Sequence, residues 1–393
     1  MIATIPPAQI GMPIADVDTP ALLIDLDAFE YNLAKMQNDL SDSHVRLRPH
    51  AKTHKCPLIA RQQIDRGAVG VCCQKTGEAE EMVYGGITDV FITNEVVGTQ
   101  KLRRIAALAR QARIAVCADD AVHVTAYDEA ARAGQVTLDV FIELDVGANR
   151  CGLEPGENLL EIARQIQRSP HLRFAGLQAY HGSAQHRRTP AERRSAIEFA
   201  VSRVKEAKAL LGHHGFTCPT VSGAGTGTYL IEAASGVYDE LQAGSYIFMD
   251  VDYAKNLGED GNPLDRFQHS LFVYTTVISR SAPDRAVVDA GHKAVPLDSG
   301  LPIVSETNDV EFVRASDEHG KLRLHNPASS LKIGDKLKLI PGHCDPTVNL
   351  FDWFVGIRNN RVEALWPITA RGIRNTFVNP TFFFFEIILK KII

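Results

Sequence analysis

Residues 45–55, VRLRPHAKTHK, form the stretch on which the interpretation of the whole chain depends. A short strand-like run ends at Pro49, and Lys52 follows between two histidines, where a strand of an α/β protein would open into a loop. A lysine amine is a nucleophile only when it is deprotonated, and burial beside other cationic groups would lower its pKa enough for Schiff-base formation. The cationic neighbours in this stretch are Arg48, His50, His54 and Lys55. The alternative is a solvated basic turn, and the stretch alone leaves the two interpretations equally open.

Composition and charge narrow the class of protein. The chain has 393 residues, of which 45% are hydrophobic and 23% charged, so it can form one large domain and a smaller one. A net charge of -5 argues against a nucleic-acid partner, because phosphate binding needs a strongly basic face, and it favours a small-molecule substrate. The seven cysteines include no CxxC pair, which indicates reduced thiols in the cytoplasm. Residues 1–7 lack the pattern of a secretory signal, and nothing before residue 375 is expected to span a membrane.

Strand-like and helix-like segments alternate from residue 46 to residue 249. The segments between the apolar runs are rich in alanine, leucine and charged residues, as amphipathic helices are. Eight such units in succession are the pattern of a (β/α)8 barrel. We therefore expect an α/β fold with a barrel domain over residues 27–265. The expected barrel strands are residues 46–50, 69–73, 90–93, 114–118, 136–144, 174–180, 220–222 and 241–249.

Past residue 265 the pattern changes to short β-rich runs separated by Gly, Pro, Asn and Asp turns. A second, mainly β domain is expected over residues 266–374, together with the N-terminal segment 1–26. Asn359 and Asn360 separate two of its runs and suit a hairpin turn, because Asn tolerates positive φ. The expected strands are residues 270–278, 286–289, 311–315, 331–340, 353–358 and 361–366. Residues 375–393 resemble neither domain and are expected to form an atypical apolar tail.

Barrel active sites lie at the C-terminal ends of the strands, so other strand ends should converge on Lys52. One strand end supplies Arg150 between glycines that let the backbone come close. Another supplies both Tyr180 and His186. The run SGAGTGT, residues 222–228, offers unobstructed backbone N–H groups and two threonine hydroxyls, as a phosphate cradle would. A Schiff-base lysine and a phosphate cradle on one barrel face together imply pyridoxal 5′-phosphate.

Eight motifs strengthen this interpretation. They are RPHAKTHK (48–55), VCCQK (71–75), NEVVG (94–98), RCG (150–152), AYHGSAQH (179–186), SGAGTGT (222–228), LQAGSYIFMD (241–250) and PGHCDPT (341–347). In this order the motifs resemble the D-threonine aldolase branch of the alanine-racemase-fold pyridoxal enzymes, which also includes 3-hydroxy-D-aspartate aldolases and D-serine dehydratases. The resemblance covers residues 17–372. One departure is Ala224, where relatives usually show a third glycine, although a small side chain still permits close approach of a phosphate.

The resemblance implies a role for individual residues. Lys52 would form the Schiff base with the cofactor, and Arg150 would meet the phenolic oxygen of the cofactor. Tyr180 would line the cofactor ring, and Tyr246 would meet the pyridine nitrogen. Gln74 is a weaker cofactor-site candidate, because it could equally be a polar residue satisfied by its neighbours. The residues implied to hold the phosphate are Gly225, Thr226, Gly227 and Thr228.

A second constellation is the tripeptide His343-Cys344-Asp345. In an extended chain residues two apart face the same way, so His343 and Asp345 could ligate one ion, although such a pair often belongs to an ordinary turn. The resemblance places a divalent cation at this pair. One imidazole, one carboxylate and water suit Mn²⁺, or else Mg²⁺ or Co²⁺, better than a thiolate-preferring Zn²⁺ site. Relatives of this fold are dimers, so a homodimer is expected.

The resemblance implies a lyase that splits a β-hydroxy-D-amino acid by a retro-aldol reaction. D-threonine would give glycine and acetaldehyde, whereas 3-hydroxy-D-aspartate would give glycine and glyoxylate. His186, or a water that it polarises, would remove the hydroxyl proton. Two alternatives stay open: a D-serine or hydroxyaspartate dehydratase, and a non-catalytic carrier of pyridoxal 5′-phosphate.

Overall fold

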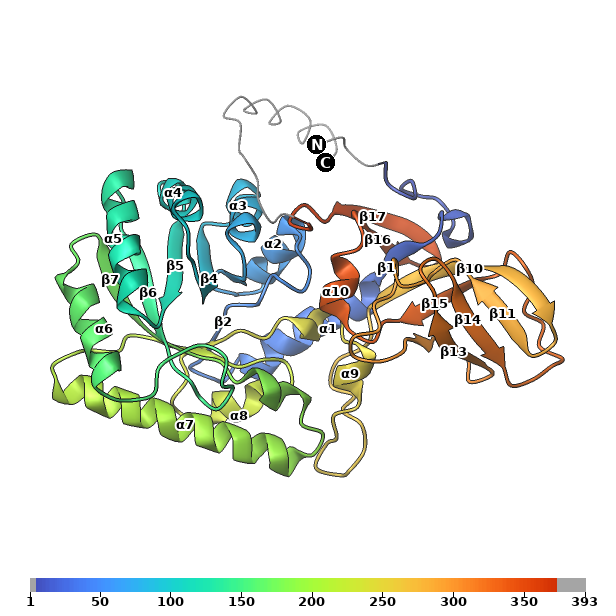
Figure 1. The fold of residues 1–393 in the computed structure, drawn as a ribbon. Coiled ribbons are helices and arrows are strands. Elements are labelled where there is room, and N and C mark those ends of the chain that lie inside the picture. Colours follow the sequence, from blue (N-terminus) through green and yellow to red (C-terminus); the bar gives the residue numbers. More distant parts are fainter. Residues whose placement is uncertain (1–4, 373–393) are drawn as a thin grey trace.

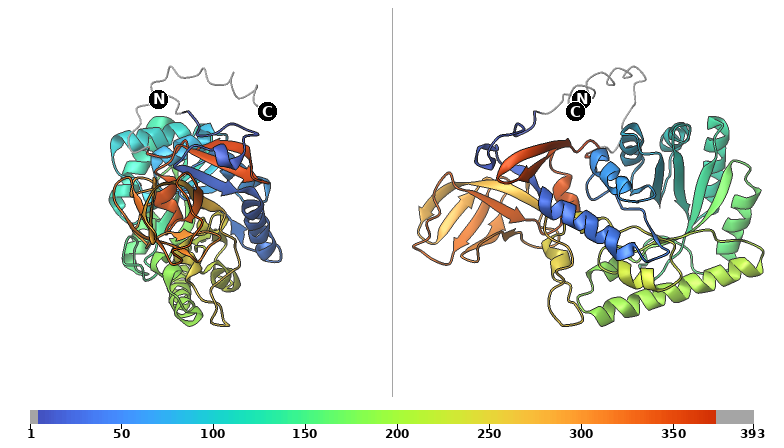
Figure 2. Two further views of the ribbon diagram at one scale, coloured as in Figure 1. Left: turned by 90° about the vertical axis from the view of Figure 1, so that its right-hand side faces the viewer. Right: turned by 180° about the vertical axis from the view of Figure 1, so that it is seen from behind.

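The computed structural model describes residues 5–372, which form a parallel barrel and a mainly antiparallel sheet lying side by side (Figure 1). Helices α1 (Leu26–Leu40) and α10 (Cys344–Val348) lie where the two parts meet. The view from behind in Figure 2 shows the same separation. The predicted tail, residues 375–393, lies outside the described residues.

Eight parallel strands form the barrel in the spatial order β2-β9-β8-β7-β6-β5-β4-β3. The ring closes between β3 and the segment after β2, where His50 and Cys72 form a parallel bridge. The strand bounds are β2 (Arg46–Leu47), β3 (Val71–Cys73), β4 (Asp89–Glu95), β5 (Arg113–Ala118), β6 (Leu138–Glu143), β7 (Leu172–Ala179), β8 (Val221–Gly223) and β9 (Glu240–Leu241). The predicted (β/α)8 fold is therefore confirmed.

Helices follow the barrel strands and cover the outside of the barrel (Figure 1). Their bounds are α2 (Pro57–Asp65), α3 (Thr76–Tyr84), α4 (Thr99–Leu108), α5 (Ala121–Gly134), α6 (Glu157–Arg168), α7 (Pro190–His213), α8 (Tyr229–Ala234) and α9 (Val251–Ala254). The long helix α7 starts at a capping box, in which Thr189 and Glu192 satisfy each other's backbone N–H groups, with Pro190 at the first helical position. The capping box and Pro190 therefore determine where the loop before α7 ends and the helix begins.

The two ends of the barrel interior have different chemistry. Arg48 donates to Glu240 and Asp89, which begin strands β9 and β4, so its guanidinium is held at the N-terminal end of the strands. Above that layer the rings of Phe91 and Phe141 stack with their centroids 4.3 Å apart. The C-terminal strand ends are thereby left for the polar side chains of the site.

The second sheet has the order β13-β14-β11-β10-β1-β16-β17, with β15 paired to β10 and β12. Strand β1 belongs to it because it pairs with β10 and β16, which places the N-terminal segment in the β part. Asn359 and Asn360 have φ values of 49° and 59°, as a tight hairpin turn requires. The strand bounds are β1 (Ala21–Asp25), β10 (Leu271–Ala282), β11 (Arg285–Val288), β12 (Ile303–Val304), β13 (Val310–Ala315), β14 (Gly320–Leu324), β15 (Lys336–Ile340), β16 (Trp353–Arg358) and β17 (Arg361–Pro367).

One predicted strand is wrong over most of its length. The apolar run 241–249 is strand only at Leu241 and then forms the short 3-10 helix η3 (Ser245–Ile247). A side chain at Gly244 would come within 2.8 Å of the His50 carbonyl oxygen, so the chain leaves the sheet here to pass close to the lysine loop. Apolarity alone does not distinguish such a buried turn from a strand.

Candidate active site

Lys52 lies in the turn that follows β2, at the C-terminal end of the barrel strands. The nearby Lys55 is engaged elsewhere, because its ammonium group pairs with Glu78 at the start of α3. The two histidines of the motif are buried: Nε2 of His50 lies 3.1 Å from the Thr93 hydroxyl, and Nδ1 of His54 accepts from the Cys56 backbone. Burial lowers the pKa of His54 to about 3, so this side chain adds no positive charge.

The partner of Lys52 is Asp345 from the β part, and the two side chains form an ion pair. Burial disfavours the ammonium form, but the Asp345 carboxylate and the Tyr180 hydroxyl outweigh it, so the pKa of Lys52 lies above its usual value. The prediction that cationic neighbours lower this pKa is therefore wrong for this arrangement. The prediction failed because of where the neighbours lie. Arg48 is bound at the other end of the barrel, and Asp345 from the β part lies beside Lys52.

Tyr180 interacts electrostatically with Lys52, and Arg150 contacts Tyr180. The guanidinium carbon of Arg150 is 5.7 Å from the centre of the Tyr180 ring, which is a cation–π arrangement. Burial raises the pKa of Tyr180, and the charges of Lys52 and Arg150 lower it in part. Arg150 also lies 3.7 Å from Glu143, a buried carboxylate at the end of β6. The pair thus connects Lys52 with the ends of β6 and β7.

The glycine-rich loop packs on Gln185, which lies in the 3-10 helix η2 (Gly182–His186). A Cβ at Gly225 or Gly227 would come within 2.6 Å or 2.5 Å of Gln185 atoms, so glycine is needed for this contact. The Gln185 side chain accepts from the Gly227 amide and donates to the Thr228 hydroxyl. The Gly227 amide and the Thr228 hydroxyl therefore already have partners. The Thr226 hydroxyl is buried and has no hydrogen-bond partner, so it is the donor of this loop that a bound phosphate would satisfy.

His186 forms a pair with Asp252 in α9. Nδ1 of His186 is 2.5 Å from Oδ2 of Asp252, while Arg188 pairs with the other carboxylate oxygen. Burial raises the pKa of Asp252, but Arg188 and His186 outweigh it and hold it below its usual value. The His186 ring lies 5.1 Å from that of Tyr253, whose hydroxyl interacts electrostatically with Tyr180 and Asp345. Tyr253 therefore bridges His186 and the Lys52 pocket.

His343 and Asp345 lie at the start of α10, not in an extended segment, so the geometric argument for their common direction is wrong. They still interact. Burial raises the pKa of Asp345, but the charge of Lys52 and then that of His343 outweigh it and hold this pKa well below its usual range. Nδ1 of His343 is 2.7 Å from Asp298, which leaves Nε2 for another ligand. Backbone bonds from Val251 and Asp252 to residues 341–342 attach this loop to α9.

Two predicted cofactor residues have other partners. The Gln74 amide donates to the Thr93 carbonyl oxygen at the ends of β3 and β4, near His50. The Tyr246 hydroxyl accepts from Gln63 of α2, and its ring packs against Phe267 in the interior between barrel and helices. The structure therefore does not bring Tyr246 together with Lys52.

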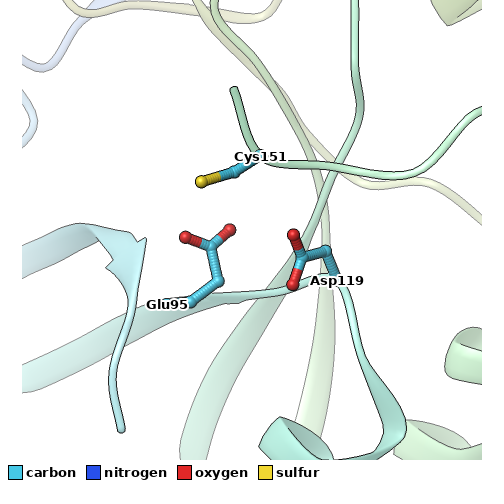
Figure 3. Close-up of side chains that lie close together, drawn as sticks. All are labelled: Glu95, Asp119 and Cys151. Carbon is cyan, nitrogen blue, oxygen red and sulfur yellow. The ribbon is translucent and has the colours of Figure 1, made fainter. Parts of the chain in front are cut away.

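A separate group of acidic side chains lies at the ends of β4, β5 and β6 (Figure 3). Glu95, Asp119 and Cys151 approach one another with potential ligand atoms within 4.8 Å. Sequence analysis did not predict this group, and it also missed Gln185, Asp252 and Tyr253. The only available signal for these residues was their position within or just after the motifs, because their roles depend on contacts between segments far apart in the chain.

Comparisons with known proteins agree with this geometry. The alanine racemase N-terminal domain family matches residues 24–252, and a serine dehydratase domain family matches residues 270–357. A D-threonine aldolase from Arthrobacter sp. is 46% identical over 371 residues, covering 94% of this chain and 97% of the relative. The chain belongs to the D-threonine aldolase and 3-hydroxy-D-aspartate aldolase branch of the alanine-racemase-fold enzymes.

Two further relatives from this aldolase branch also match over almost their whole length. A 3-hydroxy-D-aspartate aldolase from Paracoccus denitrificans (strain Pd 1222) is 44% identical, with 93% of this chain and 95% of the relative covered. The crystal structure of D-threonine aldolase from Filomicrobium marinum superposes with a TM-score of 0.91 at 47% identity, covering 95% of this chain and all of that chain. The predicted family and the lyase class are thus confirmed, and pyridoxal 5′-phosphate is the cofactor expected for this fold family. Within residues 5–372 no helix is long and apolar enough to cross a membrane.

Proposed function

We propose that this aldolase cleaves the Cα–Cβ bond of β-hydroxy-D-amino acids of the D-threonine type and releases glycine and an aldehyde. The observation that carries the proposal is the convergence of two parts of the chain: Lys52 of the barrel pairs with Asp345 of the β part, beside His343. The names of the relatives, D-threonine aldolase and 3-hydroxy-D-aspartate aldolase, support the reaction class.

The residues around Lys52 fit pyridoxal 5′-phosphate. The Lys52 amine would hold the cofactor, and Arg150, which lies over the Tyr180 ring, would bind the phenolic oxygen. The unpartnered Thr226 hydroxyl would bind the phosphate, with Gly225 and the neighbouring Gly227 and Thr228 shaping the loop. When bound, pyridoxal 5′-phosphate supplies an electron sink for the pair left on Cα as the bond breaks. We retain Gln74 as a residue that orients His50 and Thr93 at the edge of this site.

In this proposal His186 moves the hydroxyl proton. A carboxylate only accepts, so the Asp252 contact fixes the proton of the imidazole on Nδ1 and leaves Nε2 as the base. Nε2 takes the proton from the β-hydroxyl, the carbon–oxygen bond becomes a carbonyl, and the Cα–Cβ bond breaks. The aldehyde departs, and a proton added to Cα gives glycine.

His343 and Asp345 fit a divalent cation. Asp298 accepts from Nδ1 of His343, which would direct Nε2 to an ion, and the half-buried Asp345 carboxylate already faces the positive charge of Lys52. A divalent cation there would supply positive charge beside the oxygen that loses its proton. An imidazole and a hard carboxylate favour Mn²⁺, Mg²⁺ or Co²⁺ over a thiolate-preferring Zn²⁺ site, with Mn²⁺ as our choice.

The same pair favours cleavage over dehydration. The sequence of related dehydratases resembles His-x-Cys at this place. A cation bound by the softer thiolate suits loss of the hydroxyl as water. In this chain the second position is Asp345, and the buried Cys344 thiol lies beside it and donates to Oδ1 of Asp345 at 3.5 Å. A site that stabilises an oxygen anion without expelling it favours collapse to an aldehyde.

The test is a panel of substrates given to the cofactor-loaded enzyme with and without Mn²⁺. D-threonine and 3-hydroxy-D-aspartate should be cleaved to glycine, whereas L-threonine should be inert and D-serine a poor substrate for elimination. Rates with the two D-substrates decide which aldehyde is preferred. Equal turnover of D- and L-threonine would contradict the proposal, because one enantiomer alone presents its hydroxyl to His186.

We also propose that the enzyme is a cytoplasmic homodimer. All seven cysteines are free, and five of them are buried, which agrees with a reducing compartment. Light scattering should give twice the chain mass of 43.1 kDa. A monomeric mass at the concentration of the activity assay would remove the dimer from this account.

A further inference from the structure

Three potential metal ligands at barrel strand ends have no role of their own in the proposed reaction. Glu95 ends β4, Asp119 follows β5 and Cys151 follows β6, so three adjacent barrel strands deliver them to one place (Figure 3). Their ligand atoms lie within 4.8 Å of one another, and all three residues are half-buried. His343 and Asp345 come from the β part and are not members of this group.

A fourth acidic group is buried beside the three. Glu143 is only 4% exposed, and its Oε2 atom has no hydrogen-bond partner. Its carboxyl interacts electrostatically with Glu95 and Asp119, and the Cys151 thiol interacts with Glu143 in turn, so Glu143 faces the group. Burial and the charge of Glu95 raise the pKa of Glu143 to about 8. The Oε1 atom of Glu95 is also buried without a hydrogen-bond partner.

Positive charge near these acids is limited. Arg150 reaches Glu143 only at 3.7 Å, and Nδ1 of His123 lies 3.2 Å from Asp119. The Gly152 amide donates to Asp119 at 2.9 Å and holds that carboxylate in place. Buried acids with unmet oxygens are costly unless they are protonated or neutralised by a cation. A bound cation would satisfy the unmet oxygens directly.

We propose that Glu95, Asp119 and Cys151 bind a second divalent cation of the zinc class, with Glu143 as the adjacent acid that completes or supports the site. Carboxylate oxygens and a cysteine sulfur form a ligand set that Zn²⁺ and Cd²⁺ accept and Mg²⁺ does not prefer. Binding replaces the thiol proton of Cys151 by the metal and releases that proton to water, with no change in oxidation state. This site is distinct from the cation of the proposed reaction and does not depend on that reaction.

Differential alkylation of the cofactor-loaded, chelator-treated enzyme tests the proposal. Cys151 and Cys218 are the two cysteines that are not buried, so Cys218 is an internal control. Iodoacetamide labelling at alkaline pH is followed by peptide mass, with and without Cd²⁺ and with Mg²⁺ as the contrasting ion. Cd²⁺ should slow modification of Cys151 about tenfold or more and leave Cys218 unchanged, because a metal-bound thiolate is withdrawn from alkylation.

Variants of the proposed ligands and of residues outside the group test which side chains bind the cation. Glu95→Gln and Asp119→Asn should abolish the protection of Cys151. Asp120→Asn is the matched control, since Asp120 caps α5 through its side chain, Asn is also a good cap, and the residue is outside the group. Asp345→Ala should retain the protection while losing the metal that the proposed reaction needs.

The outcomes are decisive for this site alone. Equal labelling of Cys151 with and without Cd²⁺ would overturn the second cation site and leave the proposed aldol cleavage untouched. Protection that persists in both Glu95→Gln and Asp119→Asn would also overturn it, because the metal would then be bound by the thiol alone. Thermal unfolding of each variant shows whether the barrel is intact, and the wild-type comparison stands even if one variant does not fold.

Discussion

At the scale of the residue, the account depends first on Lys52. Its turn places it at the strand ends, where Asp345 and Tyr180 face it, whereas Lys55 is bound to Glu78. We expect Lys52→Ala to lose the imine absorbance and all turnover, and Lys55→Ala to keep the absorbance. Borohydride reduction followed by peptide mapping measures this directly. A pyridoxyl label on Lys55 would show that the wrong lysine has been assigned.

The second residue-scale prediction concerns the pair of His186 and Asp252. His186→Ala should lower kcat by about 10²–10⁴-fold, which is the usual contribution of general acid–base catalysis. Asp252→Asn should lower kcat less and shift the pH profile, because the imidazole loses the partner that fixes its proton on Nδ1. Cofactor absorbance should be unchanged in both variants.

A matched control for this pair is Asp260→Asn, an exposed carboxylate that bonds only its own turn. Its kcat and pH profile should equal those of the wild type. If His186→Ala retains the wild-type rate, proton transfer belongs to another group. If Asp252→Asn changes only stability and leaves the pH profile alone, Asp252 is structural.

At the level of secondary-structure elements, we propose that the contact between η2 and the glycine-rich loop shapes the binding site of the cofactor phosphate. Gly227→Ala would place a Cβ 2.5 Å from the Gln185 backbone oxygen, which cannot move without shifting η2. We expect weaker cofactor binding, measured by fluorescence titration of the apoenzyme. The control is Gly212→Ala near the end of α7, where a Cβ meets nothing within 4 Å and where alanine should stabilise the helix by about 0.5–1 kcal/mol. Unchanged cofactor affinity in Gly227→Ala would remove the loop from phosphate binding.

The sequence predicted which segments form helices and strands better than it predicted which side chains contact one another. The barrel was predictable because its strands and helices alternate with distinct periods. Lys52 and the glycine-rich run were predicted as site residues because strand ends are where barrel sites form. Tyr246 was assigned to the cofactor on resemblance, but the chain turns at Gly244 and directs the hydroxyl to Gln63. The partners of His186 and Arg48 could not be predicted, since they come from segments 41 or more residues away.

At the scale of the whole molecule, the site requires both parts of the chain. The proposed cofactor residues come from the barrel, and the proposed cation ligands come from the start of α10 in the β part. Chelation should therefore abolish turnover while the enzyme stays yellow, and His343→Ala and Asp345→Ala should reproduce that result. Activity assays and absorbance spectra of the same samples measure both properties. A chelated enzyme that keeps its full rate would exclude the cation from the reaction.

The central claim is that the carbon–carbon bond breaks and the carbon–oxygen bond does not. The most direct measurement is mass identification of the products formed from D-threonine by the cofactor-loaded enzyme in Mn²⁺. We expect glycine and acetaldehyde in equal amounts, because in the proposed reaction a cation at Asp345 would stabilise the oxygen anion and His186 would remove only a proton. 2-Oxobutanoate and ammonia as the main products would contradict it.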